Sequence, residues 1–253
     1  LIQSAFFAYG LTSLSPEYKV NISLMKVSLI ITLYGIEIYL EVFHTKYNRK
    51  AILAKEIGLP YDTRNKLEVL EELNSSGIKA YPNFFPADIK SSDGLKTNNG
   101  KIYPLGGVPN ITTIFQNESG YFPVIETDEH GFNNPKGLYE MNNVDLVLVG
   151  DSATGGDAKK SSDSIGAVLR KSGFHTISLG KAGNSSLLEF ASLKEYAKPL
   201  KPKTVLWIYH LNDSRELLSE IESTFLMKYM DDDGFSQNLI AVSYTHLTLP
   251  TKR

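Results

Sequence analysis

The sequence contains no cysteine, which excludes disulfide bonds, thiolate metal sites and a cysteine nucleophile. It also lacks an excess of charge of either sign, because 26 Lys and Arg residues stand against 28 Asp and Glu residues and the formal net charge is −2. Proteins that bind nucleic acid through its phosphates need a broad basic surface. Nucleic acid is therefore not expected as a partner.

Motifs for cofactors and metals are also missing. The glycine-rich stretch GDSATGGDAKKS, residues 150–161, does not have the residue order of a P-loop, and there is no Gly-x-Gly-x-x-Gly. No two histidines have the spacing of a metal site. The acidic run DDDG at 231–234 lacks the spaced ligands and closing Glu of a calcium loop, and it predicts a solvated helix end. No metal or cofactor is expected.

A long apolar run lies near the start of the chain. The segment ISLMKVSLIITLYGIEIYLEVF, residues 22–43, has about the 20 residues that a helix needs to cross a bilayer. Glu37 and Glu41 are four residues apart and share one face of such a helix, which is costly in contact with lipid. We interpret the segment as a membrane anchor. A buried or surface-lying amphipathic helix of a soluble protein is the alternative.

The charges around this segment bear on its orientation. Lys46, Arg49 and Lys50 lie after it and outnumber Lys19 and Lys26 in its first part and before it. Because positive charge is enriched on the cytoplasmic side of membrane proteins, these residues favour a cytoplasmic position for the domain on the C-terminal side of the segment.

Both ends of the chain are expected to be incomplete. Leu1 rather than Met opens it, and the first 14 residues carry no charge, so the sequence is expected to begin inside a longer one. The last twelve residues, VSYTHLTLPTKR, continue no helix or strand pattern and resemble read-through of a sequencing adapter. The predicted organisation is an apolar anchor at 1–43, a helical connector at 44–80, an irregular β-rich lead-in at 81–143, an α/β domain at 144–241 and a non-native tail at 242–253.

Within residues 144–241, apolar runs of strand length alternate with helical patterns. The expected strands are 144–150, 174–180 and 203–210, and the expected helices are 161–173, 185–200 and 214–230. Because the strands are apolar on both faces, they predict a parallel sheet that helices cover on both sides. Ligands of such sheets bind at the carboxyl ends of the strands.

Small and polar residues come after each of the three expected strands, at the same edge of the sheet. They are Gly150-Asp151-Ser152 after the first strand, Gly183-Asn184 after the second, and His210 with Asn212-Asp213 after the third. A serine at the start of such a turn exposes its hydroxyl, while backbone N–H groups and the Asn212 amide can stabilise an oxyanion. Acyl transfer is the chemistry that combines a nucleophile with several such donors. The alternative for the first block is an ordinary turn in which Asp151 or Ser152 caps the next helix.

These three blocks resemble those of the SGNH or GDSL hydrolase superfamily. The resemblance rests on Gly150-Asp151-Ser152 with Gly156, on Gly183-Asn184 and on Asn212-Asp213, and it extends less specifically over residues 46–240, including DEHGFNNP at 128–135. It implies a three-layer α/β/α flavodoxin-like sheet. By match, Ser152 would be the nucleophile, and its N–H, Gly183 and Asn212 would form the oxyanion hole.

The same resemblance implies the surroundings of this site. Asp151, Asn184, His210 and Asp213 would lie in or behind the pocket, and the substrate would be an ester or an acylated glycan, with no cofactor. The segment from residue 187 to 217 is most similar to bacterial, membrane-anchored members. That similarity favours an extracytoplasmic domain, against the flanking charges.

The sequence departs from the superfamily in two places. The third block usually reads Gly-x-Asn-Asp, and here His210 and Leu211 occupy its first two positions. The general base of the superfamily is a His in an Asp-x-x-His motif, and these 253 residues contain no such motif. The resemblance therefore implies that the base and the last strands lie beyond Ala241. The fold is expected to be incomplete at the C-terminus, and the chain inactive or nearly so.

No other histidine is expected to replace that base. His44 and His130 lie outside the α/β segment, His175 opens the second strand at the far end of the sheet, and His246 is in the expected non-native tail. His210 lies at a strand's carboxyl end and is expected to line the pocket rather than to act as the base. The alternative to an enzyme is a non-catalytic binding or scaffold protein of the cell envelope that retains the site as a relic.

Overall fold

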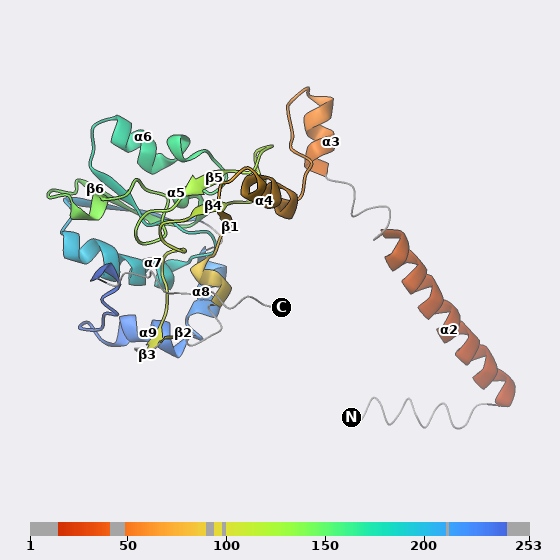
Figure 1. The fold of residues 1–253 in the computed structure, drawn as a ribbon. Coiled ribbons are helices and arrows are strands. Elements are labelled where there is room, and N and C mark those ends of the chain that lie inside the picture. Colours follow the sequence, from red (N-terminus) through yellow and green to blue (C-terminus); the bar gives the residue numbers. More distant parts are fainter. Residues whose placement is uncertain (1–14, 41–48, 90–93, 98–99, 211–212, 242–253) are drawn as a thin grey trace. The chain divides into compact units, whose positions relative to one another are not determined.

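The computed structural model describes residues 15–40, 49–89, 94–97, 100–210 and 213–241 (Figure 1). The chain divides into two compact units, Leu1–Leu59 and Pro60–Arg253. The second unit carries the candidate site.

The first unit contains a long apolar helix, α2 (Pro16–Tyr39), and a short one, α3 (Arg49–Glu56). Pro16 suits the first turn of α2 because its fixed φ is helical. Its lack of an N–H costs nothing there, because an N–H in the first turn of any helix has no acceptor within that helix. The 24 residues of α2 rise about 36 Å, and none of them is buried. By length and composition α2 can cross a membrane. It begins six residues before the apolar run at 22–43, and residues 1–14 and 41–43 of the expected anchor region lie outside the described residues.

The first helix of the second unit is α4 (Lys66–Ser75), which lies within the helical connector expected at 44–80. Its first turn is fixed by reciprocal hydrogen bonds, in which the Asn65 side chain accepts from the Glu68 N–H at 3.0 Å and the Glu68 carboxylate accepts from the Asn65 N–H at 2.8 Å. This capping box explains why a helix begins there.

The lead-in is irregular and contains only short strands, as its Pro, Gly and Asn content predicts. Its elements are β1 (Ala80–Pro82), η2 (Pro86–Ile89), β2 (Leu95–Thr97), β3 (Gly100–Ile102), β4 (Thr112–Ile114), β5 (Val124–Glu126) and η3 (Leu138–Glu140). β1 pairs parallel to β4, β4 pairs antiparallel to β5, and β2 with β3 form an antiparallel pair. All five strands lie within the lead-in expected at 81–143, except for the first residue of β1.

The parallel sheet contains β6 (Leu146–Gly150), β7 (Thr176–Ser178) and β8 (Thr204–Ile208), in the order β7-β6-β8. Its register places Leu148 beside Ser178 and Gly150 beside Ile208, so the three carboxyl ends share one edge. Figure 1 shows α6 (Ile165–Lys171) on one side of these strands and α7 (Ser186–Ser192) on the other. The predicted mixed α/β fold with parallel strands is confirmed.

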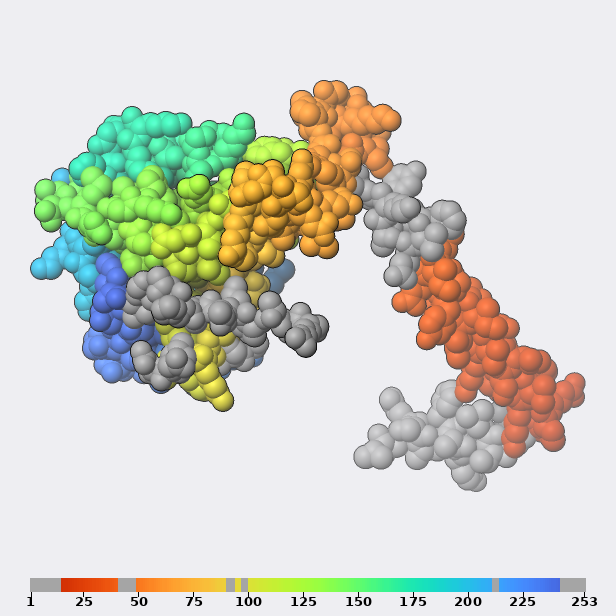
Figure 2. Space-filling model, viewed as in Figure 1, coloured from red at the N-terminus to blue at the C-terminus, as the bar shows by residue number. Residues whose placement is uncertain are grey.

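The core lies between the central strands and the helices on the α7 side. Its most buried apolar side chains include Tyr103, Leu105, Phe132, Val147, Val149, Ile177, Leu188, Tyr196, Leu226 and Tyr229. In the space-filling view the teal atoms of α6 and the blue atoms of α9 (Thr224–Asp231) lie on opposite surfaces of this unit (Figure 2).

Two expectations for this region were wrong. The segment 214–230 forms two helices, α8 (Asp213–Glu220) and α9, because Ser223 accepts a hydrogen bond from the Leu226 N–H at 3.3 Å and starts a new helix. β8 is not covered on both sides, because four of its five residues, 204–207, are exposed, with Trp207 44% exposed. β8 lies at the edge of the three-stranded sheet, where among the described strands it has a neighbour on one side only.

Candidate functional site

Ser152 comes two residues after β6 at the carboxyl edge of the sheet, and its side chain is exposed. The preceding residue, Asp151, is buried, and its carboxylate accepts from the Ala153 N–H at 2.9 Å. The single turn α5 (Ser152–Gly155) closes when the Gly156 N–H donates to the Ser152 carbonyl at 2.9 Å. Asp151 thus caps the turn, and the Ser152 hydroxyl forms no hydrogen bond within the described part of the chain.

The loop after β7 lies beside this turn. The Lys181 N–H donates to the Gly150 carbonyl at 3.2 Å, and the Ala182 N–H donates to the Asp157 carboxylate at 3.1 Å. Gly183 has φ of +75°, a left-handed conformation that other residues rarely adopt, and a Cβ there would lie 2.9 Å from the Ala87 Cβ. Both the conformation and the space require glycine at this position.

Asn184 completes this loop and has an unusual environment. Its side chain is fully buried, yet neither its amide nitrogen nor its oxygen has a hydrogen-bond partner within the described residues. The next backbone N–H groups, of Ser185, Leu187 and Leu188, all donate to the Glu220 carboxylate at 2.6–3.1 Å. A buried, unpartnered amide beside such a well-anchored turn is costly, and it is typical of a functional site.

The third strand end lies on the other side of Ser152. Since Gly150 pairs with Ile208, His210 continues past the same edge of the sheet, and it is exposed. Asn212 lies outside the described residues, and Asp213 is the first residue of α8. The structure therefore brings Ser152, Gly183, Asn184 and His210 to one edge, and it does not describe the expected oxyanion contribution of Asn212.

The other described histidines lie elsewhere. His175 precedes β7 at the opposite end of the sheet, where its ring nitrogen lies 3.2 Å from the Asn143 carbonyl oxygen. His130 is buried against the rings of Tyr139 and Tyr196, with centroids 4.5 and 5.1 Å away, and burial lowers its pKa. Across the described ranges, no group of three or more His, Asp or Glu side chains is placed to hold a metal ion.

Sequence reasoning missed a buried acid–base pair beside the site, Asp157 and Lys181. Lys181 is 3% exposed, and its amine lies 5.7 Å from the centre of the Phe132 ring. Burial raises the pKa of Asp157 to about 7, although the charge of Lys181 and the Ala182 N–H oppose the shift. Burial likewise lowers the pKa of Lys181, against the charges of Asp157 and Asp128. No sequence signal marks this pair, because a lysine in a glycine-rich loop is usually solvated.

Two asparagines of the segment 128–135 hold the first block against β7. The Asn133 amide donates to the Gly155 carbonyl at 2.9 Å. The Asn134 side chain donates to the Ser178 carbonyl and accepts from the Ser178 N–H, both at 2.9 Å, so it extends the edge of β7 as another strand would. In the sequence, the only sign of this role was the pair of adjacent asparagines in DEHGFNNP. The structure shows that they hold the backbone of Gly155 and Ser178 in place.

The raised pKa of Asp157 predicts a pH-dependent stability. Because its folded pKa of about 7 exceeds the unfolded value of 3.8, the folded chain binds this proton more tightly, and stability falls as pH rises from about 4 to 7. Asp157→Asn removes this contribution, which is at most ~1.4 kcal/mol per pH unit. Denaturant unfolding followed by the fluorescence of Trp207, the single tryptophan, measures the slope. The exposed Asp233→Asn should leave the slope unchanged, and an equal slope in Asp157→Asn and the parent would contradict the assignment.

Comparison with models of protein families, with curated proteins and with solved structures found no match to this chain. The site is accordingly interpreted from its own residues and geometry.

Proposed function

We propose that this chain carries the nucleophile and oxyanion-binding part of a serine-dependent ester hydrolase, or acyl-transferring hydrolase, of the SGNH type. The observation that carries the proposal is the exposed, uncommitted hydroxyl of Ser152 at the end of a buried parallel strand. A serine in that position can attack an acyl carbon, with the surrounding backbone N–H groups available to the oxyanion.

The donors for an oxyanion come from two neighbouring segments. Neither the Ser152 N–H nor the Gly183 N–H donates a hydrogen bond within the described residues. The Gly183 loop is fixed beside α5 by Asp157, so its N–H needs little reorganisation to receive developing negative charge. Asn212 is proposed as the third donor on the resemblance alone.

The topology is consistent with the proposed family. The strand order β7-β6-β8 is second, first, third along the chain, which is how a flavodoxin-like sheet begins. We therefore propose the three-layer SGNH hydrolase fold for this unit. Its substrate would be an ester or an acylated glycan, and α2 would hold the unit at a membrane, on the extracytoplasmic side.

A base supplied from solution tests the nucleophile directly. A fluorophosphonate probe should label Ser152 slowly in the full chain in detergent micelles, and imidazole should accelerate p-nitrophenyl acetate hydrolysis by acting in place of the missing Asp-x-x-His. Ser152→Ala should abolish the labelling and the part of the imidazole-dependent turnover that exceeds hydrolysis by imidazole without protein, since nucleophile and base together supply about 100-fold or more. Ser172→Ala, at an exposed serine after α6, is the matched control.

The outcomes separate the two functional classes. Labelling that persists in Ser152→Ala would remove Ser152 from the mechanism. A chain that neither reacts with the probe nor responds to imidazole would favour the alternative, a non-catalytic envelope binding or scaffold protein, which the His210-Leu211 departure from the third block also favours.

A further inference from the structure

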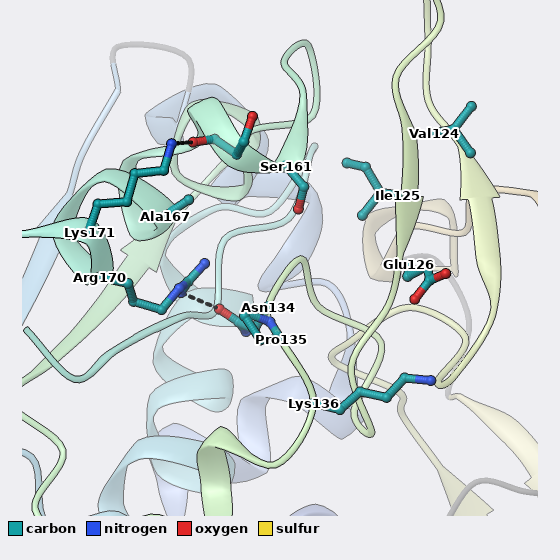
Figure 3. Close-up of a pocket in the computed structure, with 11 residues that line it drawn as sticks. Val124, Ile125, Glu126, Asn134, Pro135, Lys136, Ser161, Ala167, Arg170 and Lys171 are labelled. Atoms are coloured by element: carbon teal, nitrogen blue, oxygen red, sulfur yellow. Dashed lines mark hydrogen bonds between the residues drawn. The ribbon is translucent and has the colours of Figure 1, made fainter.

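A cleft of about 660 Å³ lies between β5 and α6, in the range of small-molecule sites (Figure 3). Val124 and Ile125 of β5 form one wall, and Arg170 and Lys171 of α6 form the other. Lys136, which follows Asn134 and Pro135, also lines the cleft. The proposed acyl chemistry at Ser152 uses none of these residues.

Positive charge predominates in this cleft. Arg170, Lys136 and Lys171 line it together with a single carboxylate, that of Glu126. None of the three cations forms an ion pair with a carboxylate in the described part of the chain. The Lys171 amine is directed toward the Ser162 carbonyl and the Lys136 amine toward the β5 side, so the two lysines add positive charge to the cleft from different sides of Arg170 (Figure 3).

Arg170 is the most constrained of these cations. Its Nη1 donates to the side-chain carbonyl of Asn134 at 3.2 Å and to the Thr176 carbonyl at 2.9 Å, and both acceptors are uncharged. A Cβ at Gly166, one turn earlier, would lie 3.1 Å from that Nη1, so glycine leaves the room that the guanidinium occupies. Burial lowers the pKa of Arg170 although the charge of Asp128 opposes the shift, which reflects the cost of partly desolvating a charge that has no direct counter-ion.

The β5 side of the cleft carries the apolar side chains of Val124 and Ile125 together with the Glu126 carboxylate. Val124 is 43% exposed on β5, and Pro135 and Ala167 also line the cleft. The Lys171 amine donates one hydrogen bond to the Ser162 carbonyl at 2.9 Å, which holds the amine in place. An ammonium group has three donors, so two remain for a ligand. An apolar wall facing fixed cations is suited to a ligand that is itself part apolar and part anionic.

We propose that this cleft binds a small organic anion, with its carboxylate or phosphate group against Arg170 and its apolar part against β5, while Lys136 and Lys171 add positive charge from two different sides of the cleft. Arg170 supplies a planar guanidinium held in place before the ligand arrives, and the two lysines add point charges. Binding should weaken as salt concentration rises, because Lys136 and Lys171 are exposed to solvent and their charges are screened by ions.

Calorimetry on the full chain in detergent micelles tests the proposal. The probes are phenyl phosphate and benzoate, with benzyl alcohol as the neutral ligand of the same ring. We expect the two anions to bind and the alcohol not to bind, and Lys136→Gln/Lys171→Gln to weaken anion binding about tenfold or more. Lys198→Gln/Lys201→Gln removes the same charge from exposed residues outside the cleft and should leave the affinity unchanged.

Three results would each overturn the proposal. They are the absence of binding at anion concentrations up to about 10 mM, equal binding of benzyl alcohol, and an equal loss of affinity in the Lys198 and Lys201 control. Neither lysine of the cleft is buried, so their double variant should melt with the parent chain, and a loss of binding there will not reflect unfolding. Because the assay measures binding, its result is independent of whether Ser152 is a nucleophile.

Discussion

Replacing Gly180 by alanine should unfold the second unit or destabilise it by about 3–5 kcal/mol. A Cβ at Gly180 would lie 2.2 Å from the Gly155 nitrogen and 2.6 Å from the Thr154 carbonyl carbon. Both contacts are with backbone, which cannot rotate away as a side chain does. Alanine at Gly155, on the other side of this contact, meets the same barrier, since its Cβ would lie 2.8 Å from the Gly180 carbonyl oxygen. The turn that carries Ser152 therefore packs backbone to backbone against the end of β7.

The control for this substitution is Gly173→Ala. Gly173 has φ of +92° with no atom within 4 Å of a built Cβ, so alanine there should cost only the backbone strain, about 1–2 kcal/mol. Denaturant titration followed by the fluorescence of Trp207 compares the two variants. If the Gly180→Ala chain were as stable as the Gly173→Ala chain, the backbone of Thr154 and Gly155 could move away from residue 180. The close approach of these two segments would then not be what positions Ser152.

Glu220→Ala should have the second large effect, a loss of about 3–5 kcal/mol, because it removes a buried charged acceptor from several donors. The Glu220 carboxylate is fully buried and accepts from the N–H groups of Ser185, Leu187 and Leu188 at 2.6, 3.0 and 3.1 Å. Alanine leaves these donors at the first turn of α7 without that acceptor. Since Ser185 directly succeeds Asn184, the loop that contains Gly183 also loses its anchor, and fluorophosphonate labelling of Ser152 should fall with the stability.

Glu222→Ala is the matched control, because Glu222 is exposed, two residues away and of the same charge. Its stability and labelling should equal those of the parent chain. Glu220→Gln keeps one acceptor oxygen and should fall between the two. If Glu220→Ala lost stability but labelled at the parent rate under native conditions, Glu220 would be a packing residue without influence on the site.

The regular elements of the second unit were predictable because their signals are local. An apolar run of strand length that ends at Gly150, or a helical pattern that ends at Gly173, depends on residues close in sequence. The split between α8 and α9 was missed because Ser223 also fits the periodic pattern. Only the hydrogen bond that its hydroxyl accepts from the Leu226 N–H marks the start of α9. The exposure of β8 was missed because an apolar strand has the same composition at an edge as in the centre of a sheet.

The sequence by itself determined which residues come after the strands, and with them the candidates Ser152, Gly183 and Asn184, together with an apolar helix long enough to span a membrane. Only the tertiary structure decided that Asp157 and Lys181 are buried as a pair, that Asn133 and Asn134 hold the site's backbone, and that three cations face one cleft. The physical reason is that burial and charge proximity depend on residues far apart in the chain. Arg170 and Lys136, for example, line one cleft because Arg170 of α6 donates a hydrogen bond to the side chain of Asn134, 36 residues earlier in the chain, which no local pattern encodes.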